Sequence, residues 1–123
     1  MSPQSLPDGR SRGDSALHIA ISRALGTVVV TLRGSLERDD AETLRAVLKD
    51  LIDHQGNLKL VVDLYRLRRL DLAGIRVLRA AAGWAGSRGA SFRLANPPSR
   101  LGPALRGAGL GQSFLFSRTA PTR

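Results

Sequence analysis

The sequence of 123 residues contains no cysteine, few aromatic residues and no long apolar run. The absence of cysteine excludes disulfide bonds, thiolate metal ligands and thiol nucleophiles. No apolar stretch reaches the roughly 20 residues of a membrane-spanning helix, and residues 1–15 contain no apolar core of an export signal. We therefore expect a cytoplasmic protein with one domain, because a chain of this length can bury a substantial core.

The residue patterns that accompany catalysis or cofactor binding are also lacking. His18 and His54 are isolated, no serine stands at a strand-to-helix elbow near a histidine, and no Gly-x-x-x-x-Gly-Lys phosphate loop occurs. Asp63 and Asp71 could in principle bind a divalent cation. Two carboxylates with no third ligand and with three arginines between them nevertheless make a poor metal site. We expect no enzyme activity, no cofactor and no metal.

Acidic residues are absent from the last 52 residues, which makes the charge of the chain uneven. Residues 1–71 hold ten acidic and eleven basic residues, a net charge of +1, whereas residues 72–123 hold eight arginines and no acid, a net charge of +8. Such a surface attracts an acidic protein, nucleic acid or anionic lipid, or is simply solvated. We favour an acidic protein partner, because aromatic residues make up only 4% of the chain and do not alternate with the basic ones as in a nucleic-acid stacking platform.

The apolar periodicity predicts alternating strands and helices. Two strands, Leu17 to Ile21 and Thr27 to Leu32, are joined by a loop from Arg23 to Gly26, which indicates a hairpin. Asp39 and Glu42 have the spacing of a capping box at the start of the first helix. Helices are predicted at residues 39–53, at residues 72–87 and from residue 102. A buried strand is predicted at residues 58–63, a short strand at 92–95 and an edge strand at 114–116.

This order predicts an α/β fold with a mixed sheet of four to five strands and about three helices. The first pair of strands is expected to be an antiparallel hairpin, and the other strands are expected to be parallel because helices connect them. We place the domain at residues 16–117. Residues 1–15 and 118–123 are rich in small, polar and charged residues and are predicted to be flexible tails.

The run from Leu58 to Ile75 reads as an apolar strand, a polar loop at residues 64–70 and a helix start. Asp71 is well placed as the N-cap, since its carboxylate can accept backbone N–H bonds from the first helical turn. Ala73 and Gly74 are small enough to let another surface approach that turn closely. In an α/β sheet this is where a site is usually found, at the carboxyl end of a strand and the amino end of the next helix.

This run resembles the signature of the STAS domain family, in which a strand ends in Asp and, after a seven-residue connection, Asp-Ser-Ser-Gly opens a helix. Gly34-Ser35-Leu36-Glu37 with the helix from Asp39 to Asp53 is similar to another segment of the family. The segments 89–97 and 105–110 are similar to its fourth strand and its third helix. The resemblance covers roughly residues 17–117 and implies a STAS-like fold.

The resemblance also implies a function, that of a bacterial anti-sigma factor antagonist, which regulates transcription through protein–protein contact. Its partner would be an anti-sigma factor of the histidine-kinase-like ATPase kind. Alternatives are a STAS subunit of a membrane transport assembly, such as a lipid-trafficking ABC system, and a basic nucleic-acid-binding protein. The partner-binding residues implied by the resemblance are Gly34, Ser35, Asp63, Asp71, Leu72, Ala73, Gly74 and Arg76.

One departure from the family pattern bears on regulation. In phosphorylation-switched members the residue after the second Asp is a serine, whereas this chain has Leu72 there and Ala73 in place of the second serine. Neither side chain carries a hydroxyl, so the resemblance transfers the fold more safely than the switch. Leu72 would instead supply an apolar anchor for the partner.

We predict that no kinase phosphorylates the helix start at residues 71–74. Incubation with a cognate kinase and ATP, followed by intact-mass measurement and peptide mapping, checks this. A phosphate localised to these four residues would contradict the prediction, whereas modification of a serine in the predicted tails would leave it standing.

Overall fold

The computed structural model of the protein describes residues 16–54 and 58–115. The predicted tails at residues 1–15 and 118–123, and Phe116 of the predicted edge strand, lie outside the described residues. Along the chain the elements are β1 (Leu17–Ala24), β2 (Thr27–Leu36), α2 (Arg38–His54), β3 (Lys59–Leu70), α3 (Leu72–Ser87), β4 (Ser91–Ala95), η1 (Ser99–Leu101), α4 (Gly102–Gly107), η2 (Gly111–Ser113) and β5 (Phe114–Leu115).

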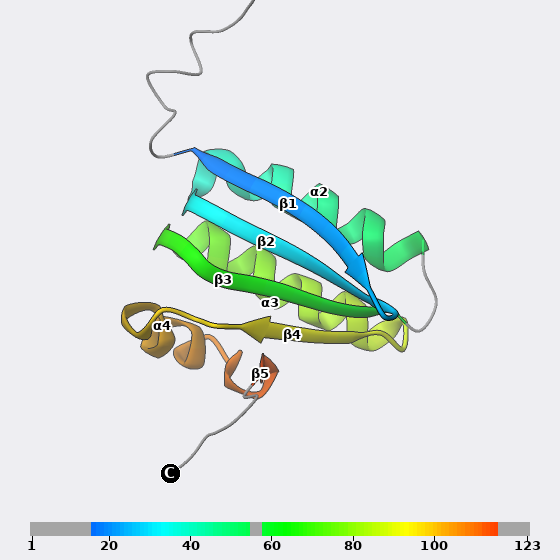
Figure 1. Cartoon of the computed structure of the whole chain (residues 1–123). Coiled ribbons are helices and arrows are strands. Elements are labelled where there is room, and N and C mark those ends of the chain that lie inside the picture. Colours follow the sequence, from blue (N-terminus) through cyan, green and yellow to red (C-terminus); the bar gives the residue numbers. More distant parts are fainter. Residues whose placement is uncertain (1–15, 55–57, 116–123) are drawn as a thin grey trace, which may run out of the picture.

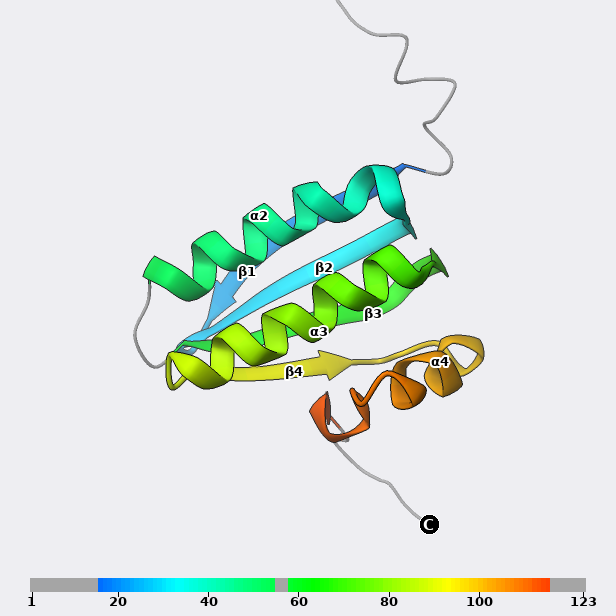
Figure 2. The same ribbon diagram turned by 180° about the vertical axis from the view of Figure 1, so that it is seen from behind.

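The strands form one five-stranded sheet in the order β1-β2-β3-β4-β5. β1 pairs antiparallel with β2, and every later pair is parallel. Figure 1 and Figure 2 show α2 and α3 side by side on one face of the sheet, and α4 near the carboxyl end of β4. None of these helices covers the other face of β1 to β4, which we call the outer face. The predicted fold class is confirmed.

The core lies between the sheet and the two long helices. Alternate residues of β2 point to the helices because side chains of a strand face opposite sides in turn. α2 and α3 each direct one apolar stripe at the sheet, with the spacing of three and four residues that a helical face requires. The core residues of these elements include Val28, Val30, Leu32, Leu44, Leu48, Leu60, Val62, Leu78, Ala81 and Ala85.

β3 corrects the prediction of a polar loop at residues 64–70, because the strand continues to Leu70. Beyond Asp63 it contains two bulges, where its register with β2 shifts between Thr31 and Arg33 and again between Gly34 and Ser35. A bulge adds a residue to one strand, so the buried residues Leu64 and Leu67 are three apart instead of two. The bulges interrupt the alternation of apolar and polar residues that identifies a strand, so a loop was predicted here.

The hairpin is longer and tighter than predicted. β1 extends to Ala24, and only Leu25 and Gly26 form the turn, with φ of 53° and 81°. Two successive residues with positive φ match the two-residue turn whose twist fits antiparallel strands. The loop predicted to start at Arg23 is therefore wrong. The hydrophobic alternation fades in this stretch because most of β1 is exposed.

The start of α2 also differs from the prediction. The helix begins at Arg38, so Asp39 lies within the first turn and is not the N-cap of a capping box. The helix is instead held at its first residue by a carboxylate from another part of the chain, described below. The short helix predicted from residue 102 is confirmed as α4, which has Pro103 in its first turn.

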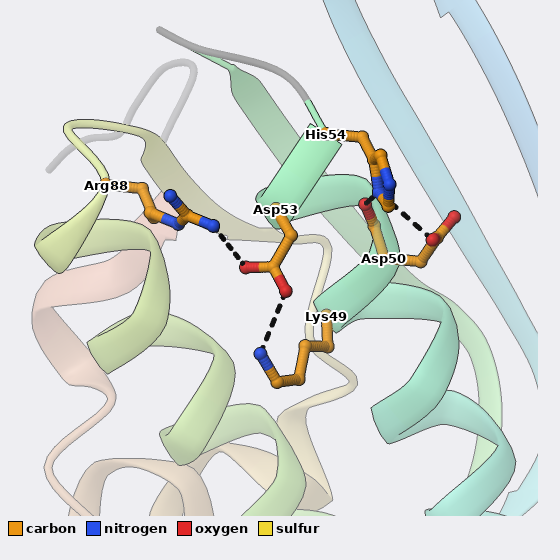
Figure 3. Close-up of polar contacts among 5 residues, drawn as sticks. All are labelled: Lys49, Asp50, Asp53, His54 and Arg88. Atoms are coloured by element: carbon orange, nitrogen blue, oxygen red, sulfur yellow. Dashed lines mark hydrogen bonds and ion pairs between the residues drawn. The ribbon is translucent and has the colours of Figure 1, made fainter.

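The carboxyl ends of α2 and α3 are joined by exposed polar contacts (Figure 3). Asp53 accepts a hydrogen bond from Lys49 Nζ at 2.9 Å and another from Arg88 at 3.0 Å, while His54 contacts Asp50 one turn away. The hydrogen bond from Lys49, followed by that from Arg88, lowers the pKa of the Asp53 carboxyl below its ordinary value of 3.8.

We predict that Asp53→Asn lowers the melting temperature slightly at neutral pH and has no effect in strong acid. Because the folded pKa of Asp53 lies below that of the unfolded chain, its stabilisation is complete above the ordinary carboxyl range and is lost as the pH falls through the folded value. Thermal melting of both proteins from pH 7 to pH 2 checks this, with Asp50→Asn as the matched control. An equal difference across this range would contradict it.

Candidate functional site

The candidate site lies where β2 and β3 end and α2 and α3 begin. Asp71 occupies the residue between β3 and α3, in an extended conformation with φ of −102° and ψ of −177°. Its Oδ1 accepts the backbone N–H of Gly74 at 3.0 Å, and its Oδ2 accepts the backbone N–H of Arg38 at 3.0 Å. The predicted N-cap is confirmed. One carboxylate thus satisfies a free N–H at the amino ends of both helices.

The first turn of α3 rests directly on the end of β2. The backbone N–H of Asp71 donates to the carbonyl oxygen of Leu36 at 3.2 Å. A Cβ added to Gly74 would come within 2.6 Å of Leu36 Cγ and 2.8 Å of the Leu36 oxygen. Since no side chain fits there, Gly74 sets the close approach of the helix to the strand. Gly74 is buried and shapes the site from below.

Gly34 and Ser35 also affect the backbone geometry of the site and add little to its exposed surface. Gly34 has φ of 100°, and the backbone of Ala16 occupies the place where a side chain would lie. Ser35 is only 2% exposed. Both residues are therefore covered by their own chain, and a partner could reach them only through the backbone around them.

Leu72, Ala73 and Arg76 form the accessible part of the helix start. Leu72 is 60% exposed and is one of four large apolar residues that are exposed within the described residues. It lies at one end of an open hollow of about 390 Å³ between α3 and α4. The hollow combines an apolar floor with basic side chains from α3, and its lining residues are Leu72, Ile75, Arg76, Arg79, Ala104, Gly107 and Ala108.

The sequence analysis did not assign Ile75, Arg79 or α4 to the site. A signal for Arg79 was present, because residues 72, 76 and 79 are four and seven positions apart and share one face of a helix. The contribution of α4 to the hollow could not have been predicted from such spacing. It depends on how the chain folds back after β4, which local spacing does not report.

Asp63 does not lie beside the helix start. It stands within β3, opposite Thr31 of β2, and its Oδ1 accepts the backbone N–H of Tyr65 at 3.0 Å and the side-chain amide of Asn96 at 3.2 Å. The eight positions to Asp71 correspond to at most roughly 26 Å of strand, which the two bulges shorten. Asp63 thus fixes the first bulge of β3 and links that strand to the residue after β4.

The part of the chain that the structure describes contains no group of three His, Cys, Asp or Glu residues that could hold a metal ion. Its helices are also too short or too polar to cross a membrane. The helix start presents an exposed leucine and two exposed arginines on a backbone held by Asp71 and Gly74.

The fold is similar to the folds of known proteins. The family model "Mlab, STAS domain" matches residues 19–117. The solved structure of the anti-sigma factor antagonist SpoIIAA in its unphosphorylated form is 21% identical, with a TM-score of 0.68 over 84% of this chain and 89% of that one. An anti-sigma factor antagonist from Mycobacterium paratuberculosis is 19% identical, with a TM-score of 0.69 over 85% of this chain and 88% of that one.

A transporter also contains this fold. The murine anion transporter Slc26a9 in its inward-facing state is 19% identical, with a TM-score of 0.62 over 74% of this chain but only 15% of that one. At these identities the likeness shows a shared fold. A sequence search of curated proteins finds no match.

We predict that Asp71→Ala lowers the free energy of unfolding by about 1–3 kcal/mol, because it removes an N-cap and a second hydrogen bond to a helix start. Asp71→Ser should recover part of the loss. Its single hydroxyl can cap Gly74 but cannot bond to both helices. Urea unfolding of the three proteins measures this. If Asp71→Ala differs from the wild type by less than about 0.5 kcal/mol, the shared carboxylate does not hold the two helices.

Proposed function

Because this chain belongs to the STAS domain family, we propose that it is a regulatory protein–protein interaction module acting as an anti-sigma factor antagonist. Its partner would be an anti-sigma factor of the histidine-kinase-like ATPase kind. The structural likeness to SpoIIAA and to the M. paratuberculosis antagonist supports this proposal. The role requires contact, not catalysis, from the chain.

The observation that carries the proposal is the exposure of Leu72 at a rigid helix start. Asp71 fixes the first turn, and Gly74 packs that turn on Leu36, so Leu72 is presented on a backbone that needs little rearrangement on binding. Full burial of a leucine side chain is worth roughly 1.5–3 kcal/mol. A partner that covers Leu72 and enters the hollow between α3 and α4 would gain this energy.

Charge favours an acidic partner at this surface. Arg76 and Arg79 flank the apolar floor of the hollow, and both are exposed. Arg76 also lies in the second turn of α3, where a positive charge opposes the partial positive charge of a helix amino end. An acidic group from the partner would offset that unfavourable interaction. The contact surface we propose comprises Asp71, Leu72, Ala73 and Arg76, shaped by Gly34, Ser35 and Gly74, with Asp63 at a distance along β3.

In this proposal the contact is not switched by phosphorylation at the helix start, since Leu72 stands at the position where switched members of the family carry serine. The partner would then be regulated through its own state or through the amounts of the two proteins. Mass action alone would set the occupied fraction.

A second candidate function is that of a STAS subunit in a membrane transport assembly. The likeness to the STAS-like part of the murine anion transporter Slc26a9 favours it. Capture of the full chain's partners from native lysate separates the two candidates. An ATPase with the histidine-kinase fold supports the first, and the components of a transporter support the second.

We predict that Leu72→Asp weakens partner binding at least about tenfold, equivalent to 1.4 kcal/mol, while the melting temperature changes little. The variant loses the apolar anchor and places an uncompensated charge in the interface. In the free protein a carboxylate near a helix amino end is tolerated or mildly stabilising. Calorimetry with the captured partner measures affinity, and thermal melting measures stability.

Leu25→Asp is the matched control. Leu25 is 102% exposed and lies in the hairpin turn at the opposite end of β2, and its positive φ is one that Asp tolerates. We expect it to bind as the wild type does. If Leu72→Asp melts far below the wild type while its folded fraction binds normally, Leu72 is a structural residue and the proposed contact is wrong.

A further inference from the structure

Three basic side chains lie in one row across the outer face of the sheet. His18 of β1 is the register partner of Arg33 of β2, and Arg33 is the register partner of Arg66 of β3. Register partners share a face, with backbones roughly 5 Å apart. All three residues are exposed. The row was not apparent in the sequence, because its members lie 15 and 33 positions apart and the first bulge of β3 determines which arginine meets Arg33.

This row is unfavourable in the isolated protein. Like charges directly opposite each other on neighbouring strands destabilise a sheet. Within the described residues, the guanidinium groups of Arg33 and Arg66 form no ion pair with an acidic side chain. Asp63, the acidic residue nearest to them along β3, is occupied by Tyr65 and Asn96. An arrangement that costs stability and lacks an internal partner points to an anionic ligand.

A third guanidinium is held rigidly at the end of the row. Arg100, just before α4, donates to the carbonyl oxygens of Arg68 at 2.6 Å and Leu67 at 3.4 Å. These two bonds fix the guanidinium against the second bulge of β3. Arg100 lines an open hollow of about 610 Å³ together with His18, Arg33, Tyr65 and Arg66. A second hollow, of about 450 Å³, adjoins it through His18, Arg33 and Arg66.

We propose that these two adjoining hollows form a groove that binds an acidic peptide segment of a partner protein. The groove is open to solvent and its lining crosses β1, β2 and β3 to Arg100, which suits an extended chain carrying several carboxylates. A guanidinium can pair with a carboxylate through two hydrogen bonds, so Arg33 and Arg66 could each hold one acidic side chain. Residues 1–15 of this chain are a poor occupant, because their two Asp and two Arg give no net charge.

This groove is distinct from the surface around Leu72. The hollow beside Leu72 is formed by α3 and α4, whereas the groove lies over β1, β2 and β3 on the face that α2 and α3 leave uncovered. The inference therefore goes beyond the proposed function and stands or falls independently of it.

Fluorescence anisotropy with a fluorescein-labelled octaglutamate peptide tests the groove, with the full chain at fixed ionic strength. We expect Arg33→Gln/Arg66→Gln to weaken binding at least tenfold. The matched control, Lys59→Gln/Arg45→Gln, removes the same charge at exposed residues outside the groove and outside the hollow beside Leu72, and should weaken binding less than threefold. Melting of the groove variant should be unchanged or higher than that of the wild type, because a repulsive pair has been removed.

Several outcomes would overturn the proposal. Equal weakening by both double variants would show attraction to net charge only. A clear fall in the melting temperature of the groove variant would make the two arginines structural. Full displacement of the peptide by inorganic phosphate at the same ionic strength would indicate a site for small anions. Tighter binding of a single-stranded oligonucleotide, lost in the groove variant, would make this a nucleic-acid site.

Discussion

The arrangement of this fold depends on one carboxylate shared between two helices. Asp71 accepts one N–H from the first turn of its own helix and another from Arg38, 33 residues earlier in the chain. The first contact fixes where α3 begins, and the second brings the start of α2 to the same point. With Gly74 packed on Leu36, this carboxylate brings together the ends of two strands and the beginnings of two helices. Leu72 is presented from this rigid junction.

The structural features that depend on local chemistry could be predicted from the sequence. The apolar run at residues 58–63, the cap at Asp71 and the small residue Gly74 correctly predicted a strand, a helix start and a close approach. The course of β3 beyond Asp63 could not be predicted, because two bulges break the alternation that identifies a strand. The bond from Arg38 to Asp71 was also beyond local spacing, and its absence from the prediction led to the incorrect capping box at Asp39.

In the candidate site, some residues set the backbone geometry and others are exposed on its surface. Among the residues that resemblance assigned to partner binding, Gly34, Ser35 and Gly74 are buried, and Leu72 and Arg76 are exposed. The buried residues let backbone segments approach one another, and the exposed ones lie on top of that junction. In the proposed function, a change at an exposed position such as Leu72 would alter recognition while the junction beneath it keeps its geometry.

The long β3 strand has a consequence for self-association. Its pairing with β4 ends at Asp63, so from Leu64 to Leu70 the described chain pairs it on the β2 side only. An open strand edge is a template on which a second copy could add a strand and begin aggregation. Here the bulges interrupt the ladder, Arg100 occupies the carbonyl oxygens of Leu67 and Arg68, and arginines at positions 66, 68 and 69 add repulsion between copies. The bulges and the arginines, which obscured the strand pattern in the sequence, thus also protect the edge of β3 against strand addition.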